Sequence, residues 1–206
     1  MLEIEIRPAE EKDYKETENI ARQAFYRDDR IAEIGVGCTE PYMLHMLRKE
    51  VGIKELDFVA YVDGKAVGQI IYSHSHIRRP DGSLVDTLNF GPLSVLPEFQ
   101  KMGVGSALMR YSMKRAKELG YGAILFFGHP EYYPRFGFVQ ASKYGIETEW
   151  QADTPAFMAI ELKEGYLKDV TGIYLEAPVY DEEITKLPSM EYEKEFAGQN
   201  GEQGGH

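Results

Sequence analysis

The chain has 206 residues, 43% of them hydrophobic, which suits one domain with a sizeable core. Its 34 acidic and 23 basic residues give a net charge of −11, which disfavours binding to the phosphate backbone of nucleic acids. The chain has one cysteine, Cys38, which excludes an internal disulfide and a multi-cysteine zinc site. The sequence has no signal-peptide pattern and no long apolar run. We therefore expect a cytoplasmic protein with no membrane contact.

The first quarter of the chain predicts one strand and two helices. Apolar residues alternate with charged ones from Leu2 to Ile6, which indicates a half-buried strand ending at Pro8. Acidic residues and then an apolar stripe at helical spacing predict a helix that reaches Phe25. We expect an irregular loop over residues 28–38 and a second helix over residues 41–51.

The middle of the chain predicts a hairpin, a long strand and a crossover. Asp63-Gly64 between two apolar runs is a hairpin signal, and the next strand should cover Leu84 to Val95. A helix with an apolar face from Val104 should end at Gly120, before a buried strand over residues 123–127. This crossover predicts that the two flanking strands are parallel.

The last part of the chain predicts less structure. Residues 156–162 and 173–175 are strand-like, whereas the acidic stretch 181–195 is expected to be a solvated surface. We therefore divide the chain into a domain over residues 1–162, an extension packed on the core over residues 163–196 and a flexible polar tail over residues 197–206.

A glycine-containing turn from Gln100 to Ser106 lies between the long strand and the helix. Unpaired backbone N–H groups and the helix dipole favour an anion at such a position, and Gly103 and Gly105 allow close approach of a diphosphate. The turn lacks the lysine of nucleotide triphosphatase loops, and Leu108 replaces the third small residue of the dinucleotide fingerprint. Neither nucleotide hydrolysis nor a nicotinamide or flavin site is expected.

Three segments, LSVLPEFQKMGVGSALM, AKELGYGAILFFG and EYYPRFGF, resemble the GNAT superfamily of N-acetyltransferases in motif, order and spacing. The resemblance covers roughly residues 1–162, and the FGPLSVLPE and YYxRFGF signatures resemble an uncharacterised bacterial-type branch. It implies an α/β (α+β) fold with a mixed, mostly antiparallel twisted sheet of about 6–7 strands, helices on both faces, and splayed fourth and fifth strands.

The resemblance also implies a co-substrate, acetyl-CoA, and the residues that hold it. The pantetheine arm would run along the end of the fourth strand and the pyrophosphate would lie on the glycine turn. The implied cofactor-binding residues are Leu93, Ser94, Val95, Gln100, Lys101, Met102, Gly103, Val104, Gly105, Ser106, Tyr133 and Phe136.

The Tyr-x-x-x-Gly-Phe element of the family maps onto Tyr133, Gly137 and Phe138, which implies that Tyr133 is the general acid for the departing thiolate. A phenol with a pKa near ~10 suits that role. A primary amine acceptor is mostly protonated at pH 7, so a base is expected. The candidates from the sequence are Asp86, His74, His129 and Glu131.

Several alternatives remain open from the sequence. His74, His76 and His129 are interpreted as surface groups, so no metal is expected, and Cys38 as a small loop residue. The main hypothesis is acetyl transfer to a small-molecule or peptide amine by direct attack in a ternary complex, and the alternative is a non-catalytic acyl-CoA sensor. The sequence leaves the acceptor open and is compatible with a homodimer.

Overall fold

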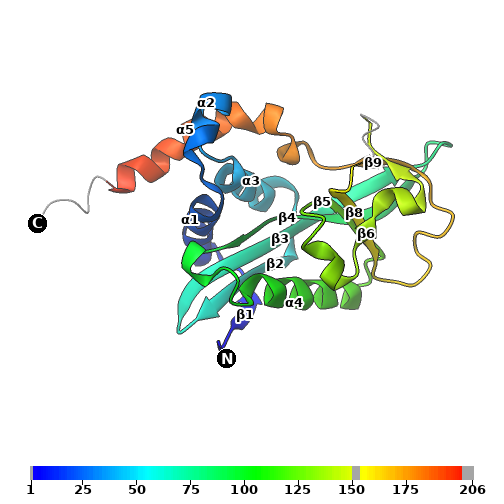
Figure 1. The fold of residues 1–206 in the computed structure, drawn as a ribbon, viewed down its shortest axis with the longest axis horizontal. Helices are drawn as coiled ribbons and strands as arrows, with labels where there is room; N and C mark the ends of the chain where they lie inside the picture. The colour runs from blue at the N-terminus through cyan, green and yellow to red at the C-terminus, as the bar shows by residue number, and fades with distance from the viewer. Residues whose placement is uncertain (1, 150–153, 201–206) are drawn as a thin grey trace, which may run out of the picture. The chain divides into compact units, whose positions relative to one another are not determined.

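The computed structural model describes residues 2–149 and 154–200, which fall into two compact units (Figure 1). The first unit comprises residues 1–71, 92–108 and 178–206, and the second comprises residues 72–91 and 109–177. The helices are α1 (Tyr14–Phe25), α2 (Asp28–Ile34), α3 (Glu40–Met46), α4 (Val104–Glu118) and α5 (Glu182–Asn200). The strands are β1 (Glu5–Pro8), β2 (Gly52–Val62), β3 (Lys65–Arg78), β4 (Leu84–Val95), β5 (Ala123–Phe127), β6 (Val139–Gln140), β7 (Ile146–Glu147), β8 (Phe157–Glu161) and β9 (Gly172–Leu175).

The strands form one mixed sheet. In the first unit the neighbours run β1–β2–β3–β4, and in the second they run β3–β4–β5–β8–β6, with β9 pairing both β3 and β7. The β4–β5 pair is parallel, with Leu88 opposite Ile124, while β1–β2, β5–β8, β6–β8 and β3–β9 are antiparallel. This confirms the predicted fold class, although the two-residue strands β6 and β7 are too short to leave a pattern in the sequence.

The predicted hairpin and crossover are confirmed at their expected residues. Asp63 and Gly64 have φ of 49° and 77°, as a two-residue turn matched to the twist of the strands requires. Gly120, with φ of 92°, follows α4 and ends it in the left-handed conformation that glycine favours at this position. The strand β4 and the buried strand β5 have the predicted bounds.

One expectation about the first unit is wrong. Residues 28–34 form α2 rather than an irregular loop, since Asp28 and Asp29 favour its first turn and Gly35 ends it with φ of 82°. No residue of α2 is buried, so the helix has no apolar stripe that the sequence could reveal.

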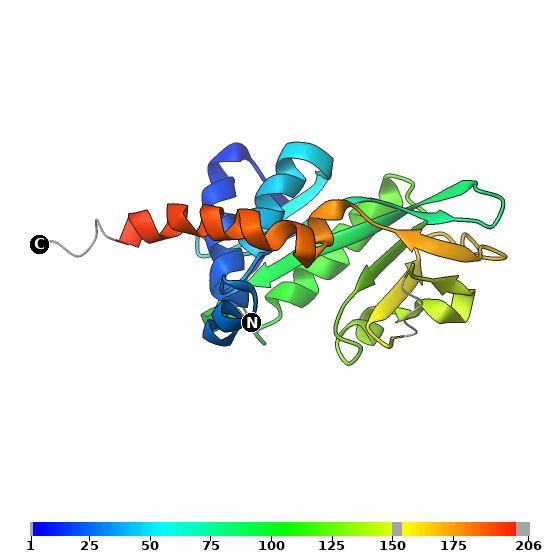
Figure 2. The same ribbon diagram turned by 90° about the horizontal axis from the view of Figure 1, so that it is seen from above.

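The acidic stretch 181–195 forms most of α5, and Glu183, Glu191 and Glu195 in it are exposed, in line with the solvated surface expected there. Tyr192 OH donates to the buried Glu18 carboxylate at 2.6 Å. Glu193 and Glu195 form ion pairs with basic residues of α1, and Glu182 pairs with Arg30 of α2. These three acidic residues of α5 therefore have partners more than 150 positions away, which charge patterning within a segment cannot reveal. Figure 2 shows the ribbon of α5, orange to red, beside the blue helices of the first unit. The helix runs to Asn200, and the remainder of the predicted tail, residues 201–206, lies outside the described residues.

The buried carboxylate of Asp13 links the start of the chain to β2 through hydrogen bonds. Asp13 accepts hydrogen bonds from both terminal nitrogens of Arg7 (2.8 and 2.9 Å), from Tyr61 OH (2.7 Å) and from the amide of Glu10 (2.9 Å). Burial would raise the pKa of Asp13, but these hydrogen bonds outweigh it and lower the pKa to about 2. Asp13 is therefore ionised in the folded protein at every pH above that value.

The substitution Asp13→Asn is expected to lower the free energy of unfolding by about 2 kcal/mol at pH 7. Because the pKa of Asp13 is lower in the folded state, its contribution is fully present above the unfolded value and disappears as the pH falls through about 2. Urea unfolding of both proteins between pH 7 and pH 2 measures the difference. A difference that stays constant over this range would contradict the ionic role of Asp13.

Candidate functional site

The glycine-containing turn forms an open backbone loop in the first unit. A short 3-10 helix over Pro97–Phe99 follows β4, and Gln100 to Gly103 are exposed. Lys101 and Gly103 both have positive φ, at 62° and 97°, and a Cβ at position 103 would meet no atom within 4 Å. The turn therefore leaves space above the backbone that a ligand group can occupy.

The start of α4 directs backbone N–H groups towards this space. The hydrogen-bond ladder of α4 begins where the amide of Ala107 donates to Gly103 O at 2.9 Å, so the amides of Val104 and Gly105 precede it. With 15 residues, α4 has a substantial dipole, whose positive end favours an anion. The residues from Gln100 to Ser106 that were predicted to bind the cofactor thus form an exposed turn, residues 100–103, followed by the first residues of α4. We call residues 100–106 the cradle.

The strand that leads into the cradle is fixed by side-chain hydrogen bonds. Gln69 Nε2 donates to Pro92 O at 2.9 Å and to Ser94 Oγ at 2.7 Å, and both side chains are buried. Gln100 Nε2 donates to Val95 O at 3.1 Å, which closes the turn between strand and cradle. Because the Ser94 side chain is turned to Gln69, only its backbone is left for the predicted cofactor contact, whereas Leu93 and Val95 are half-buried.

Gly68 of β3 is a residue that the sequence did not single out. A Cβ here would lie 3.0 Å from Ser94 O, 3.1 Å from Val104 Cγ1 and 3.2 Å from Leu108 Cδ1. The absence of a side chain therefore lets the first turn of α4 pack closely on β3 and β4 within the first unit. A glycine inside a strand is the signal that indicates such a close approach.

Tyr133 lies in the second unit, in an aromatic cluster. It begins a 3-10 helix that ends at Gly137, and its ring lies 4.5 Å from that of Phe126, 5.7 Å from that of Phe90 and 6.0 Å from that of Phe138. Only 9% of Tyr133 is exposed. Burial raises the pKa of the phenol, so its hydroxyl stays protonated and remains a donor at neutral pH.

Phe136, the other predicted cofactor contact near Tyr133, is at the end of the same 3-10 helix. Its ring lies 5.3 Å from the guanidinium carbon of Arg110 in α4 and 6.4 Å from the ring of Tyr133. The structure therefore brings Tyr133 and Phe136 together.

The four base candidates from the sequence are all exposed. Asp86 is 81% exposed and its Oδ1 lies 3.4 Å from Nε2 of His76. The ring of His74 lies 5.9 Å from that of Tyr121. His129 and Glu131 lie in the turn before Tyr133. The backbone oxygen of His129 accepts from the amide of Tyr132 at 3.0 Å, so this residue shapes the turn through its main chain.

The structure adds a carboxylate that the sequence did not indicate. Glu176 follows β9, and its Oε2 accepts from Nδ2 of Asn89 at 2.9 Å and lies 3.4 Å from Tyr174 OH. Asn89 is 2% exposed and Tyr174 is 4% exposed. No motif marks Glu176, because its partners are on β4 and on a four-residue strand at the end of the second unit.

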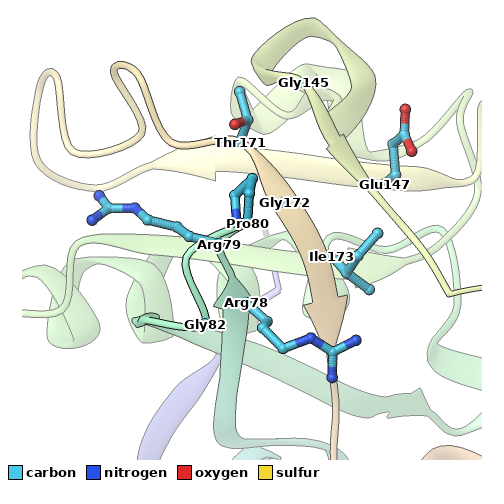
Figure 3. A pocket seen from close by; sticks show the side chains of 9 residues that line it. All are labelled: Arg78, Arg79, Pro80, Gly82, Gly145, Glu147, Thr171, Gly172 and Ile173. Carbon is cyan, nitrogen blue, oxygen red and sulfur yellow. The ribbon is translucent and has the colours of Figure 1, made fainter.

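A separate pocket of about 500 Å³ opens at the end of β3 (Figure 3). It is lined by Arg78, Arg79, Pro80, Gly82, Gly145, Glu147, Thr171, Gly172 and Ile173. Arg78 is paired with Glu149 at 3.0 Å. The pocket contains none of the predicted site residues.

In residues 2–149 and 154–200, no three His, Cys, Asp or Glu side chains come together in a way that could hold a metal ion. Burial raises the pKa of Cys38 to about 12, so its thiolate is not available near pH 7. Within the same residues, no helix is long and apolar enough to cross a membrane.

Comparison with known proteins shows what part of the chain is similar to. Residues 55–140 match the family model described as an acetyltransferase (GNAT) domain. The chain is 36% identical over 94 residues to the uncharacterized N-acetyltransferase YjhQ of Escherichia coli, a match to 45% of this chain and 51% of that protein. The chain thus matches about half the length of that relative. It is 28% identical over 135 residues to the uncharacterized N-acetyltransferase YhbS of Escherichia coli, covering 65% of this chain and 78% of YhbS.

Solved structures support the same fold. The crystal structure of YhbS in complex with CoA has a TM-score of 0.75 at 23% identity and covers 88% of this chain and 93% of that one. A GNAT family acetyltransferase from Brucella melitensis in complex with acetyl-CoA has a TM-score of 0.65 at 22% identity, covering 88% of this chain and 100% of that one. At these identities the likeness shows the fold.

Proposed function

We propose that the protein transfers an acetyl group from acetyl-CoA to a primary amine by direct attack in a ternary complex, a proposal that the match of residues 55–140 to the GNAT acetyltransferase model supports. The observation that carries this proposal is the cradle. Its residues 100–103 are exposed, with positive φ at Lys101 and Gly103 and open space at Gly103, and its residues 104–106 begin a long helix. This combination suits a diphosphate held by backbone N–H groups.

In this proposal the cradle holds the pyrophosphate of CoA. The amides from Gly103 to Ser106 donate to its oxygens, and the exposed backbone of Lys101 and Met102 leaves room for the ligand. The backbones of Leu93 and Val95 bind the amides of pantetheine. Val95 O already accepts from Gln100, so a ligand amide would use its second lone pair.

Tyr133 acts as the general acid. As the bond between the acetyl carbon and sulfur breaks, the electron pair leaves on the sulfur, and the Tyr133 hydroxyl donates to the developing thiolate. The raised pKa of Tyr133 keeps the proton on the phenol until that charge develops. Its ring is held by Phe90, Phe126 and Phe138, which fixes the direction of the hydroxyl.

A transfer assay with the purified chain tests this proposal. Acetyl-CoA is mixed with a panel of small primary amines and peptides with free amino groups, and release of the CoA thiol is followed together with the mass of the acetylated amine. We expect thiol release that depends on at least one amine. Binding of acetyl-CoA without transfer to any acceptor would contradict the enzyme and support the non-catalytic sensor.

A further inference from the structure

We propose that Glu176 is the general base that takes the proton from the acceptor amine, and that Asn89 and Tyr174 hold its carboxylate in place. This inference rests on the proposed function, because it concerns the same transfer. It assigns the catalytic base to a residue outside the 55–140 match and outside the four candidates from the sequence.

The first argument is the way in which the carboxylate is held. Glu176 Oε2 accepts from the buried amide of Asn89 at 2.9 Å, and Tyr174 OH lies 3.4 Å from the same oxygen. The single proton of the Tyr174 hydroxyl is shared between Glu176 and Leu125 O of β5, which lies 3.0 Å away. Glu176 is thus tied to both β4 and β5 while its side chain is only partly covered. A base must be positioned as well as accessible, and this carboxylate is both.

The second argument is the position of Glu176 relative to the general acid within the second unit. Leu88 of β4 lies opposite Ile124 of β5, so the next residues, Asn89 and Leu125, are neighbours, and Phe90 and Phe126 follow them. The rings of Phe90 and Phe126 hold Tyr133.

Successive residues of a strand point to opposite faces of a sheet. Tyr174 packs in a buried cluster with Leu125, whereas Tyr133 packs on Phe126. Glu176 and Tyr133 therefore lie on opposite faces of β4 and β5. The strand residues on the side of Glu176 and those on the side of Tyr133 are one position apart along each strand. A thioester held between these strands would have the base on one side, where it serves the attacking nitrogen, and the acid on the other, where it serves the departing sulfur.

The proton and electron balance of the step is complete with these two groups. The Glu176 carboxylate takes a proton from the ammonium, and the freed nitrogen lone pair attacks the acetyl carbon. The C–N bond forms, the C–S bond breaks, and the sulfur takes its proton from Tyr133. The second proton lost by the nitrogen restores the Tyr133 hydroxyl through water, and Glu176 releases its proton to the solvent. The net products are the acetylated amine, CoA and one proton.

The test compares two probe nucleophiles with acetyl-CoA in the thiol-release assay. n-Butylamine is protonated at pH 7 and needs a base, whereas hydroxylamine is already neutral and needs one much less. With Glu176→Gln, which keeps the acceptor oxygen for Asn89, we expect kcat with n-butylamine to fall about 10²-fold. The KM for acetyl-CoA should stay within about twofold, and the loss with hydroxylamine should be less than about tenfold.

Two further variants separate this role from a structural one. Glu147→Gln removes an exposed carboxylate of β7, which pairs with β9, and should leave both reactions unchanged. Tyr174→Phe removes the hydroxyl beside Glu176 and should lower kcat with n-butylamine about tenfold, but it should add little in the Glu176→Gln background, because coupled groups are not additive.

The two-nucleophile assay separates failure of the inference from failure of the proposed function. Equal turnover of Glu176→Gln and the unaltered chain with n-butylamine would overturn the inference while leaving the transferase in place. An equal loss with both nucleophiles would overturn it as well, because that result describes damage to the site rather than the loss of a base. No transfer by the unaltered chain with either nucleophile would overturn the proposed function and the inference together.

Discussion

The substitution Gly103→Glu is expected to reduce the affinity for acetyl-CoA by about a thousandfold. It places a carboxylate at the position where the cradle faces the pyrophosphate, and like charges brought together at a binding site cost several kcal/mol. A thousandfold loss corresponds to about 4 kcal/mol. Isothermal titration of the variant with acetyl-CoA measures the effect directly.

A matched control separates this charge effect from backbone strain. Gly64 also has a positive φ, 77°, and open space at the position of a Cβ, but it lies in the turn between β2 and β3. Gly64→Glu therefore introduces the same charge and comparable strain away from the cradle, and we expect it to bind acetyl-CoA as the unaltered chain does. If Gly103→Glu binds as tightly as Gly64→Glu, the cradle does not hold the pyrophosphate.

The substitution Tyr133→Phe is expected to lower kcat by about 10²- to 10³-fold, with little change in the affinity for acetyl-CoA. General acid–base catalysis contributes rate factors of about this size. The ring that packs on Phe126 is retained, so only the hydroxyl is lost. The rate of CoA thiol release at saturating substrate gives kcat, and isothermal titration with acetyl-CoA gives the affinity.

Tyr132→Phe is the control for Tyr133→Phe. Tyr132 is the neighbouring phenol, its ring lies 5.1 Å from that of Tyr133, and its spacing to Gly137 is one residue longer than the family element requires. We expect the Tyr132→Phe variant to have the same kcat as the unaltered chain. A full loss in Tyr132→Phe and none in Tyr133→Phe would assign the acid to the other tyrosine, whereas no loss in either would remove the phenol from the mechanism.

The parts of the fold that the sequence predicted correctly are those with a local physical signal. The turn at Asp63-Gly64, the glycine after α4 and the continuous apolar run of β5 each report a conformation or an environment within a few residues. The helix α2 escaped prediction because none of its residues is buried. The helix α5 escaped prediction because Glu182, Glu193 and Glu195 pair with residues of α1 and α2, which are distant in the sequence.

In the candidate site too, the residues that the sequence predicted are those with a local signal. The cradle could be predicted because backbone binding of a diphosphate depends on glycines and a helix start that are contiguous in the sequence. Gly68 and Glu176 could not be assigned, because the role of each depends on contacts made by distant segments, Ser94 and Val104 for Gly68 and Asn89 for Glu176. Residues that act through tertiary contacts leave no spacing pattern.

The most direct test of the central claim, that this chain uses acetyl-CoA, is isothermal titration of the unaltered protein with acetyl-CoA, with CoA and separately with NADH at moderate salt. We expect saturable one-to-one binding of acetyl-CoA and CoA and no binding of NADH. Absence of binding by both CoA compounds would contradict the cradle as a CoA site, and with it the proposed transferase.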